Sequence, residues 1–191
     1  MVVVGIDEVG RGCWAGPVVS GAVILAHHIE GLKDSKKLSS IKRSQLSNAI
    51  QAEALAYGTG WVTAVELDDI GLTNAVRLSM QRALAQISIE YDDIIIDGNY
   101  NFLSDNSKAH CIVKADESVP SASAASIIAK VARDNFMIEQ AKIFQHYGFE
   151  RHVGYGTRLH LERLKQLGIC SLHRKSYKPV QLIANLESRT V

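Results

Sequence analysis

The stretch Val2-Val3-Val4-Gly5-Ile6-Asp7-Glu8-Val9-Gly10-Arg11-Gly12 decides how this chain begins to fold. Its first half, Val2 to Ile6, is a short and mostly β-branched run, which is typical of a buried strand. Two carboxylates and a glycine-rich segment over residues 10–16 follow, and a second apolar run covers Val18 to Ala26. We therefore expect two paired strands joined by a functional turn.

Helix and strand signals alternate along the rest of the chain. Ser39 or Ser40 can cap a helix that ends near Tyr57, and Thr157 can cap another that ends at Gly168. Apolar residues spaced by four and three predict a helix over 72–87, and a long segment rich in Ala, Ile and Lys predicts another over 121–146. Short apolar runs predict strands over 61–65, 93–97 and 111–115. This order, β-β-α-β-α-β-β-α-α, predicts an α/β fold with a mixed sheet.

Composition and length indicate one domain. The chain has 191 residues, of which 47% are hydrophobic and 21% charged, as in ordinary globular proteins. No linker divides it, so we expect a single domain over 1–191, with 157–191 as a helical C-terminal extension. Its three cysteines form no C-x-x-C pair, which argues against a disulfide framework or a zinc site. Neither a secretion signal nor an 18-residue apolar run is present, so we expect a cytoplasmic protein with no membrane partner.

Positive charge is concentrated in two segments although the net charge is only +1. Residues 31–50 hold five Lys or Arg against one Asp, and residues 142–178 hold eight against two Glu. The second segment includes Arg158 and Arg174, with Tyr155 and Tyr177 interleaved. Such segments are typical of phosphate binding, although a charge run taken alone is more often a solvated face.

The chemistry is carried by acids at the ends of predicted strands. Asp7 and Glu8 end the first strand, and Asp97 and Asp116 end two later apolar runs. An ionised carboxylate beside a buried strand is costly unless it is paired or coordinated, and a hard divalent cation is a suitable partner. Each acid alone could be a turn former or helix cap, but four together favour a metal site. Adjacent residues on a regular strand point to opposite faces, so either the first strand bends or one of its two acids contributes differently, for instance through its carbonyl.

Six ordered motifs make the chain resemble bacterial ribonuclease HII from about residue 4 to Pro179. They are Gly5-Ile6-Asp7-Glu8-Val9-Gly10-Arg11-Gly12, Asp34-Ser35-Lys36-Lys37-Leu38, Ile96-Asp97-Gly98-Asn99, Lys114-Ala115-Asp116, the segment from Ser123 to Lys130 with Arg133-Asp134, and Tyr147-Gly148-Phe149 with His152 to Thr157.

This resemblance implies a ribonuclease H-like fold with a five-stranded mixed sheet flanked by helices. It also implies a metal-dependent endonuclease that hydrolyses the RNA strand of RNA–DNA hybrids and incises duplex DNA on the 5′ side of single embedded ribonucleotides. The cofactor is expected to be Mg²⁺ or Mn²⁺, with two ions during catalysis, and the protein is expected to be a monomer. A ribonuclease H that needs several consecutive ribonucleotides and a catalytically silent binding module are the alternatives. Gln181-Leu182-Ile183 faintly resembles a sliding-clamp peptide, but we favour a terminal amphipathic helix there.

The resemblance also assigns site residues. The metal ligands are Asp7, Glu8, Asp97 and Asp116. The expected substrate contacts are Gly10, Arg11, Gly12, Lys36, Asn99 and Tyr155, to which the second basic segment adds Arg158 and Arg174. Glycines in the turn allow close approach of the backbone, whose N–H and C=O groups can read a 2′-hydroxyl, while Tyr155 stacks at the RNA-to-DNA junction.

Asp134 is expected on a buried helical face, either supporting the metal site or forming a buried salt link. The chain departs from the family pattern at Cys13-Trp14, where Pro-Leu is usual, at Gly156, where proline is usual, and at Tyr177, where phenylalanine is usual. We expect Gly156 to loosen the loop that carries Tyr155.

Overall fold

A single mixed sheet of five strands organises the molecule in the order β3-β2-β1-β4-β5. The computed structural model describes residues 1–32 and 38–187. Strand β1 pairs antiparallel with β2, and β2 with β3, while β1 pairs parallel with β4, and β4 with β5. The strands are β1 Val3–Val9, β2 Val18–Leu25, β3 Ala54–Val62, β4 Asp93–Asp97 and β5 Ala109–Ile112. The predicted α/β fold with a mixed sheet is confirmed.

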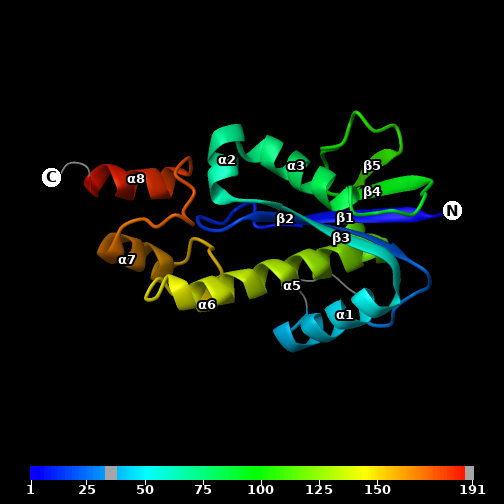
Figure 1. Cartoon of the computed structure of the whole chain (residues 1–191), viewed down its shortest axis with the longest axis horizontal. Coiled ribbons are helices and arrows are strands. Elements are labelled where there is room, and N and C mark those ends of the chain that lie inside the picture. Colours follow the sequence, from blue (N-terminus) through cyan, green and yellow to red (C-terminus); the bar gives the residue numbers. More distant parts are fainter. Residues whose placement is uncertain (33–37, 188–191) are drawn as a thin grey trace.

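Helices cover both faces of this sheet, as Figure 1 shows. Helices α2 and α3 lie on one face, α1 and α5 lie on the other, and α6, α7 and α8 gather beyond the end of the sheet at which β1 finishes. The helices are α1 Ser40–Glu53, α2 Ala64–Ile70, α3 Leu72–Leu84, α4 Ala115–Ser118, α5 Pro120–Ile143, α6 Phe149–His152, α7 Arg158–Leu167 and α8 Lys178–Glu187. Ser39 and Thr157 act as the predicted N-caps, and a helix occupies the C-terminal segment as expected.

The two largest apolar clusters of the described residues lie one on each face of the sheet. Ile6, Ile24 and Met80 belong to the core between the sheet and α3. Ile50 and Ile127 belong to the core between the sheet and the α1–α5 layer. Because both faces are covered, every residue of β2 except the last is buried. The central strands are thus fixed from both sides, which holds the ends of β1 and β4 in place.

The region between α1 and α3 differs from the sequence prediction. Strand β3 begins at Ala54, where a helix was expected, and the expected strand over 61–65 is wrong because residues 64–70 form α2. A capping box starts α2: the Thr63 hydroxyl accepts from the Glu66 N–H, and the Glu66 carboxylate accepts from the Thr63 N–H. This capping box is the sequence signal for a helix here, and it lies next to the apolar run that favours a strand.

The expected strand over 111–115 is also displaced. Strand β5 ends at Ile112, and Lys114 adopts the left-handed conformation with φ 59°. Asp116 therefore lies in the first turn of the short helix α4 and not at a strand end. A carboxylate in the first turn of a helix is favoured by the helix dipole, which suits this position.

We expect Gly60→Ala to lower the free energy of unfolding by about 3 kcal/mol. A Cβ at this position in β3 would lie 1.8 Å from the Ser79 carbonyl oxygen and 2.5 Å from the Ala83 nitrogen. Both are backbone atoms of α3 and cannot rotate away, so the helix must move off the sheet. Urea denaturation followed by circular dichroism measures the effect.

The matched control is Leu55→Ala on the same strand, where the side chain is 52% exposed. That change should alter the unfolding free energy by no more than about 0.5 kcal/mol. Equal losses in the two variants would contradict a close contact between β3 and α3.

Candidate active site: a carboxylate cluster beside a buried turn

The parallel pairing of β1 with β4 brings the first two predicted acids together. Ile6 is in register with Ile96, so the next residues on the two strands, Asp7 and Asp97, lie beside one another at the same end of the sheet. Asp116 joins them from α4, where its N–H lies 3.5 Å from Asp97 Oδ1. Carboxylate oxygens of these three residues all lie within 4.8 Å of one another. Three acids far apart in the sequence thus form one cluster.

Burial makes this cluster electrostatically unfavourable without a cation. Desolvation, followed by the negative charge of Glu8, raises the pKa of Asp7 to about 8, although a hydrogen bond from Ser126 on α5 opposes that shift. A bare Asp7 would hold a proton at neutral pH. A nearby positive charge would restore the ionised form.

Glu8 occupies a different position from the other three acids. Its Oε1 accepts from Arg11 Nη1 at 3.0 Å, and its Oε2 is buried with no hydrogen-bond partner among the described residues. Glu8 is not part of the cluster of three, yet burial raises the pKa of Glu8 and the charge of Asp97 adds to that shift. The alternation of side chains along β1 therefore separates Asp7 from Glu8, but Asp97 lies near both.

The donor set fits a hard divalent cation. It consists of carboxylate oxygens, and the buried Glu8 Oε2 is a polar atom that still needs a partner. Mg²⁺ and Mn²⁺ prefer oxygen ligands and bind through few carboxylates while retaining water. No zinc-type set of His and Cys contributes to this cluster.

The glycine-rich turn after β1 is held by buried arginines. Gly10 has φ 92°, and a Cβ there would lie 2.4 Å from Arg133 Nε. Arg133 is completely buried and donates to the carbonyls of Ala15, Pro17 and Val153 at 2.8–3.0 Å. Arg133 therefore connects the turn to the loop before Tyr155.

The prediction that Arg174 reaches substrate phosphates is wrong for this structure. Its side chain is completely buried and donates to the carbonyls of Gly16 and Arg11 at 2.9 and 3.0 Å. The Tyr177 hydroxyl also donates to the Arg11 carbonyl, so the departure from phenylalanine at this position adds a contact to the turn. The sequence suggested a phosphate ligand because a charge run does not reveal which of its members are buried.

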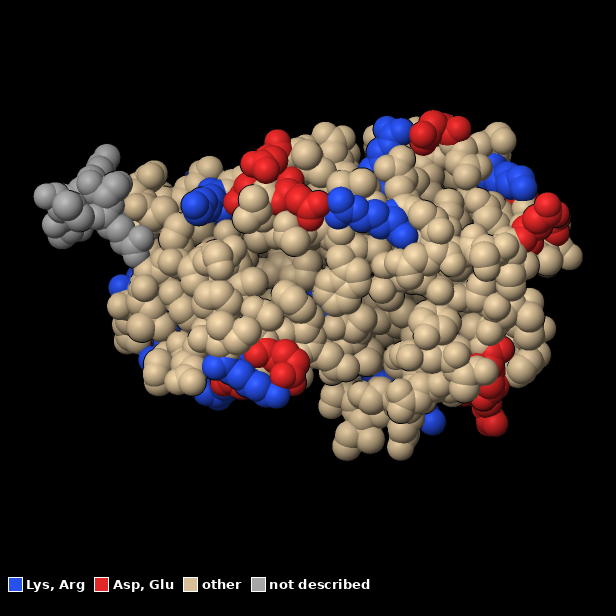
Figure 2. All heavy atoms as spheres, in the orientation of Figure 1, with Lys and Arg blue, Asp and Glu red and all other residues tan. Residues whose placement is uncertain are grey.

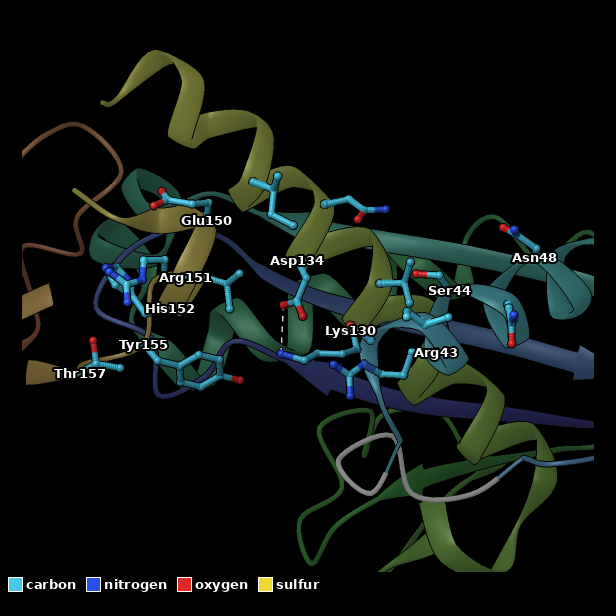
Figure 3. A pocket seen from close by; sticks show the side chains of 17 residues that line it. Arg43, Ser44, Asn48, Lys130, Asp134, Glu150, Arg151, His152, Tyr155 and Thr157 are labelled. Atoms are coloured by element: carbon cyan, nitrogen blue, oxygen red, sulfur yellow. Dashed lines mark hydrogen bonds and ion pairs between the residues drawn. The ribbon is translucent and has the colours of Figure 1, made fainter. Parts of the chain in front are cut away.

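Tyr155 lies beside this turn and at one end of a groove that Figure 3 shows between α1, α5 and the loop after α6. Its backbone forms an antiparallel bridge with Cys13, and its hydroxyl forms a hydrogen bond with the Cys13 side chain. Lys130 Nζ lies 5.3 Å from the centre of its ring. Tyr155 is 38% exposed, so a ligand can reach its ring, while the contacts with Cys13 and Lys130 hold the side chain in place.

Other predicted residues fall outside the cluster. Asp134 pairs with Lys130 Nζ at 3.0 Å, which corresponds to the salt-link alternative, and the charged residue of this helix that is completely buried is Arg133 instead. Asn99 is exposed, and Arg158 is exposed and pairs with Glu162 at 2.8 Å. Lys36 lies outside the described residues.

The charge distribution is mixed on the face drawn in Figure 2. Lys and Arg side chains lie near Asp and Glu along the rims, and the central part of this face carries little charge. Two basic residues of the segment 142–178 have acidic partners, Lys142 with Glu139 and Arg158 with Glu162. The basic segments of the sequence therefore do not translate into a continuous basic surface on this face.

Trp14 and Gly156 fit together. A Cβ at position 156 would lie 2.1 Å from Trp14 Cε2 and 2.5 Å from Trp14 Nε1, so the indole ring occupies the space that a side chain at 156 would take. The same ring contacts His160 at 5.4 Å between centroids. These contacts oppose the expectation that Gly156 loosens the Tyr155 loop, because the Trp14 ring packs against the glycine.

The sheet, the helices on both faces and the carboxylate cluster define a ribonuclease H-like nuclease. Residues 4–180 match the family model "Ribonuclease HII", and the chain belongs to that family. A curated ribonuclease HII of Marinomonas sp. (strain MWYL1) is 47% identical over 181 residues, which cover 94% of this chain and 91% of that protein.

Solved structures agree with this assignment. Ribonuclease H2 from Pyrococcus horikoshii OT3 is similar with a TM-score of 0.83 and 26% identity over 99% of this chain and 100% of that one. The structure of a PCNA:RNase HII complex from Archaeoglobus fulgidus is similar with a TM-score of 0.77 and 25% identity, covering 93% of this chain and 96% of that one.

The activity follows from family membership. The protein is a metal-dependent endoribonuclease that degrades the RNA strand of RNA–DNA hybrids and incises DNA at embedded ribonucleotides. The acidic cluster provides the carboxylates that such an enzyme needs. Among the described residues, no helix combines the length and apolarity required to cross a membrane.

We expect Gly156→Ala to lower the free energy of unfolding by about 2 kcal/mol, because the new methyl group displaces the Trp14 ring. In a Trp14→Leu background the same change should cost much less, giving a coupling energy of about 1–2 kcal/mol. A double-mutant cycle by urea denaturation measures this coupling. The same cost in both backgrounds would show that the two residues act independently.

Proposed function

We propose that Asp7, Glu8, Asp97 and Asp116 together hold the catalytic divalent cations, Mg²⁺ or Mn²⁺, with two ions present during the reaction. The observation that supports this most directly is the approach of Asp7, Asp97 and Asp116 oxygens to within 4.8 Å. The buried and unpartnered Glu8 Oε2 supplies a fourth oxygen nearby. When bound, such ions activate water and stabilise the negative charge of the phosphate during hydrolysis.

The protein's own residues prepare the cluster for this role. Ser126 on α5, outside the cluster, donates to Asp7, and the main-chain N–H of Asp116 lies near Asp97 Oδ1, so each of these two acids has a donor beside it. Arg11 holds one oxygen of Glu8 and leaves the other available. The acids are thus positioned before a substrate arrives, which reduces the reorganisation that the reaction requires.

Recognition of RNA is assigned to a separate set of groups. Cations can activate water beside any phosphate, and only the 2′-hydroxyl distinguishes a ribose from a deoxyribose. We propose that main-chain groups of Gly10, Arg11 and Gly12 read that hydroxyl, and that Tyr155 stacks on the sugar at the junction with DNA. The backbone bridge between Cys13 and Tyr155 supports this, because it joins the two recognition elements.

Further partners remain narrower proposals. Lys36, Asn99 and Arg158 are proposed contacts to the duplex, and the exposure of Asn99 and Arg158 is compatible with that role. The relative from Archaeoglobus fulgidus forms a complex with PCNA. A second proposed contact is that of Gln181-Leu182-Ile183 of α8 with a sliding clamp, in a protein that we expect to act as a cytoplasmic monomer.

We expect Asp97→Asn to reduce cleavage of a duplex with one embedded ribonucleotide by roughly a thousandfold. The change removes a charge from the cluster but no contact to phosphate, so the Kd for the duplex should stay close to that of the wild type. The increase in Tm on adding Mn²⁺ without substrate should also be lost, because a cation stabilises a fold only when it binds.

Asp105→Asn is the matched control, since it makes the same chemical change at a side chain that is 60% exposed and pairs with Arg77. Cleavage and the Mn²⁺-induced rise in Tm should both persist in this variant. Substantial activity in Asp97→Asn would remove Asp97 from the site.

We expect Tyr155→Ala to harm cleavage at a single embedded ribonucleotide more than cleavage of a continuous RNA–DNA hybrid. A hybrid offers many registers, whereas the single site depends on the junction with deoxyribose. Tyr155→Phe separates the two functions of the side chain: full activity indicates stacking, and a large loss indicates the hydroxyl. Rates measured on both substrates decide, and equal damage in Tyr155→Ala would place junction recognition elsewhere.

A further inference from the structure

Three histidines form a buried cluster behind the Tyr155 loop and outside the carboxylate site. His152, His160 and His173 are 6%, 0% and 2% exposed. The rings of His152 and His160 stack at 4.3 Å between centroids, and those of His160 and His173 lie 5.2 Å apart. The metal site does not use them, yet His160 contacts the main chain of Tyr155.

The hydrogen bonds at the two ends of this cluster fix the protons within it. The Cys170 N–H donates to His173 Nδ1 at 2.9 Å, so in the neutral ring the proton of His173 is on Nε2. At the other end, the Tyr155 carbonyl can only accept, so His160 must carry a proton on Nδ1, 2.9 Å from that oxygen. His173 Nε2 then donates to His160 Nε2 across 3.0 Å.

This relay works with both rings neutral. A second proton on His160 would place two N–H groups against each other between the Nε2 atoms. Burial, the largest cause, lowers the pKa of His160 to about 4 and that of His173 to about 4, and His152 stacked on His160 acts in the same direction. The relay therefore keeps one arrangement of donors at neutral pH.

The carbonyl at the end of the relay belongs to the residue whose ring is proposed to read the substrate. It accepts from the Thr157 N–H at 2.8 Å as well as from His160, and the Tyr155 N–H donates to the His152 carbonyl at 2.8 Å. The peptide groups on both sides of the Tyr155 Cα are thus held. Because the ring direction depends on the backbone from which it projects, holding these groups also restricts the ring.

We propose that His160, kept in one tautomer by His173, is a positioning residue that fixes Tyr155 for recognition of a single ribonucleotide in DNA. This inference rests on the proposed role of Tyr155. It adds a specificity determinant that touches neither the cation nor the substrate, and that acts through one hydrogen bond to a main-chain carbonyl.

Two substitutions of His160 separate the ends of the relay. In His160→Asn, the amide nitrogen takes the place of Nδ1 and keeps the donation to Tyr155, but the contact with His173 is lost. In His160→Gln, the longer side chain can accept from His173 Nε2 but offers no donor at the Nδ1 position. Both variants lose part of the buried packing, so they serve as controls for one another.

The measurement is the ratio of the cleavage rate on a single-ribonucleotide duplex to that on a continuous RNA–DNA hybrid. We expect His160→Gln to lower this ratio about tenfold, the effect of one lost hydrogen bond, and His160→Asn to retain it. Amide hydrogen exchange at Thr157, whose N–H shares the Tyr155 carbonyl, should accelerate in His160→Gln only. An unchanged ratio in His160→Gln, or equal losses in both variants, would overturn the proposal.

The Tyr155→Ala variant distinguishes a failure of the proposed role of Tyr155 from a failure of the positioning role of His160. If Tyr155→Ala leaves the ratio unchanged, Tyr155 does not read the junction and the positioning proposal falls with it, even where Thr157 exchange shows that His160 holds the loop. If Tyr155→Ala lowers the ratio and His160→Gln does not, only the positioning proposal fails.

A measurement on the wild-type protein keeps the test valid if the His160 variants do not fold. Imidazole ¹⁵N chemical shifts at pH 7 distinguish the two neutral tautomers from the charged ring. We expect an Nδ1–H tautomer for His160 and an Nε2–H tautomer for His173. The opposite tautomer at His160, or a charged ring at either position, would overturn the relay.

Discussion

Two buried arginines hold the functional part of this molecule by binding main-chain carbonyls. Arg133 donates to Ala15, Pro17 and Val153, and Arg174 donates to Gly16 and Arg11. Burying a guanidinium is costly, so the carbonyl dipoles that solvate it cannot leave without exposing an unsolvated charge. The two arginines therefore keep the loops that supply those carbonyls together, although these loops come from distant parts of the chain.

Helix α5 links the reacting site to the recognition site through this arrangement. Ser126 near its start orients Asp7, and Arg133 further along holds the turn and the loop before Tyr155. A helix is stiff over this length because hydrogen bonds connect its successive turns, so α5 sets the distance between the acids and the proposed recognition elements. In the proposed function the two tasks are chemically independent, because the acids would hold cations and the turn with Tyr155 would contact the sugar. Enzymes benefit from holding such groups in place before substrate binds.

The sequence predicted the strands that carry Asp7 and Asp97 well, because β-branched runs ending in acids are a local signal. Three of the four predicted acids meet in space: Asp7 and Asp97 at the ends of the parallel strands β1 and β4, and Asp116 from helix α4, whereas Glu8 lies outside this cluster. The prediction failed where burial decides the role of a charge. Arg174 looked like a phosphate ligand and Asp134 like the buried residue of α5, whereas Arg174 and Arg133 are the buried ones. A signal was available for Arg133, which lies seven residues from Ser126 and four from Met137 on the buried face of the helix. No local pattern could indicate the histidine relay, because its members meet only through tertiary packing.

The departures from the family pattern show how this network accommodates change. Cys13, Trp14, Gly156 and Tyr177 all touch either the glycine-rich turn or the loop that carries Tyr155. A glycine in place of proline gives the unfolded chain more freedom, which by itself disfavours a fixed loop. Here the Trp14 ring fills the space above Gly156, the Cys13 bridge holds the backbone of Tyr155, and His160 holds its carbonyl. The position of Tyr155 therefore depends on contacts made around the loop and not on the stiffness of the loop itself, so proline can be replaced without losing the arrangement.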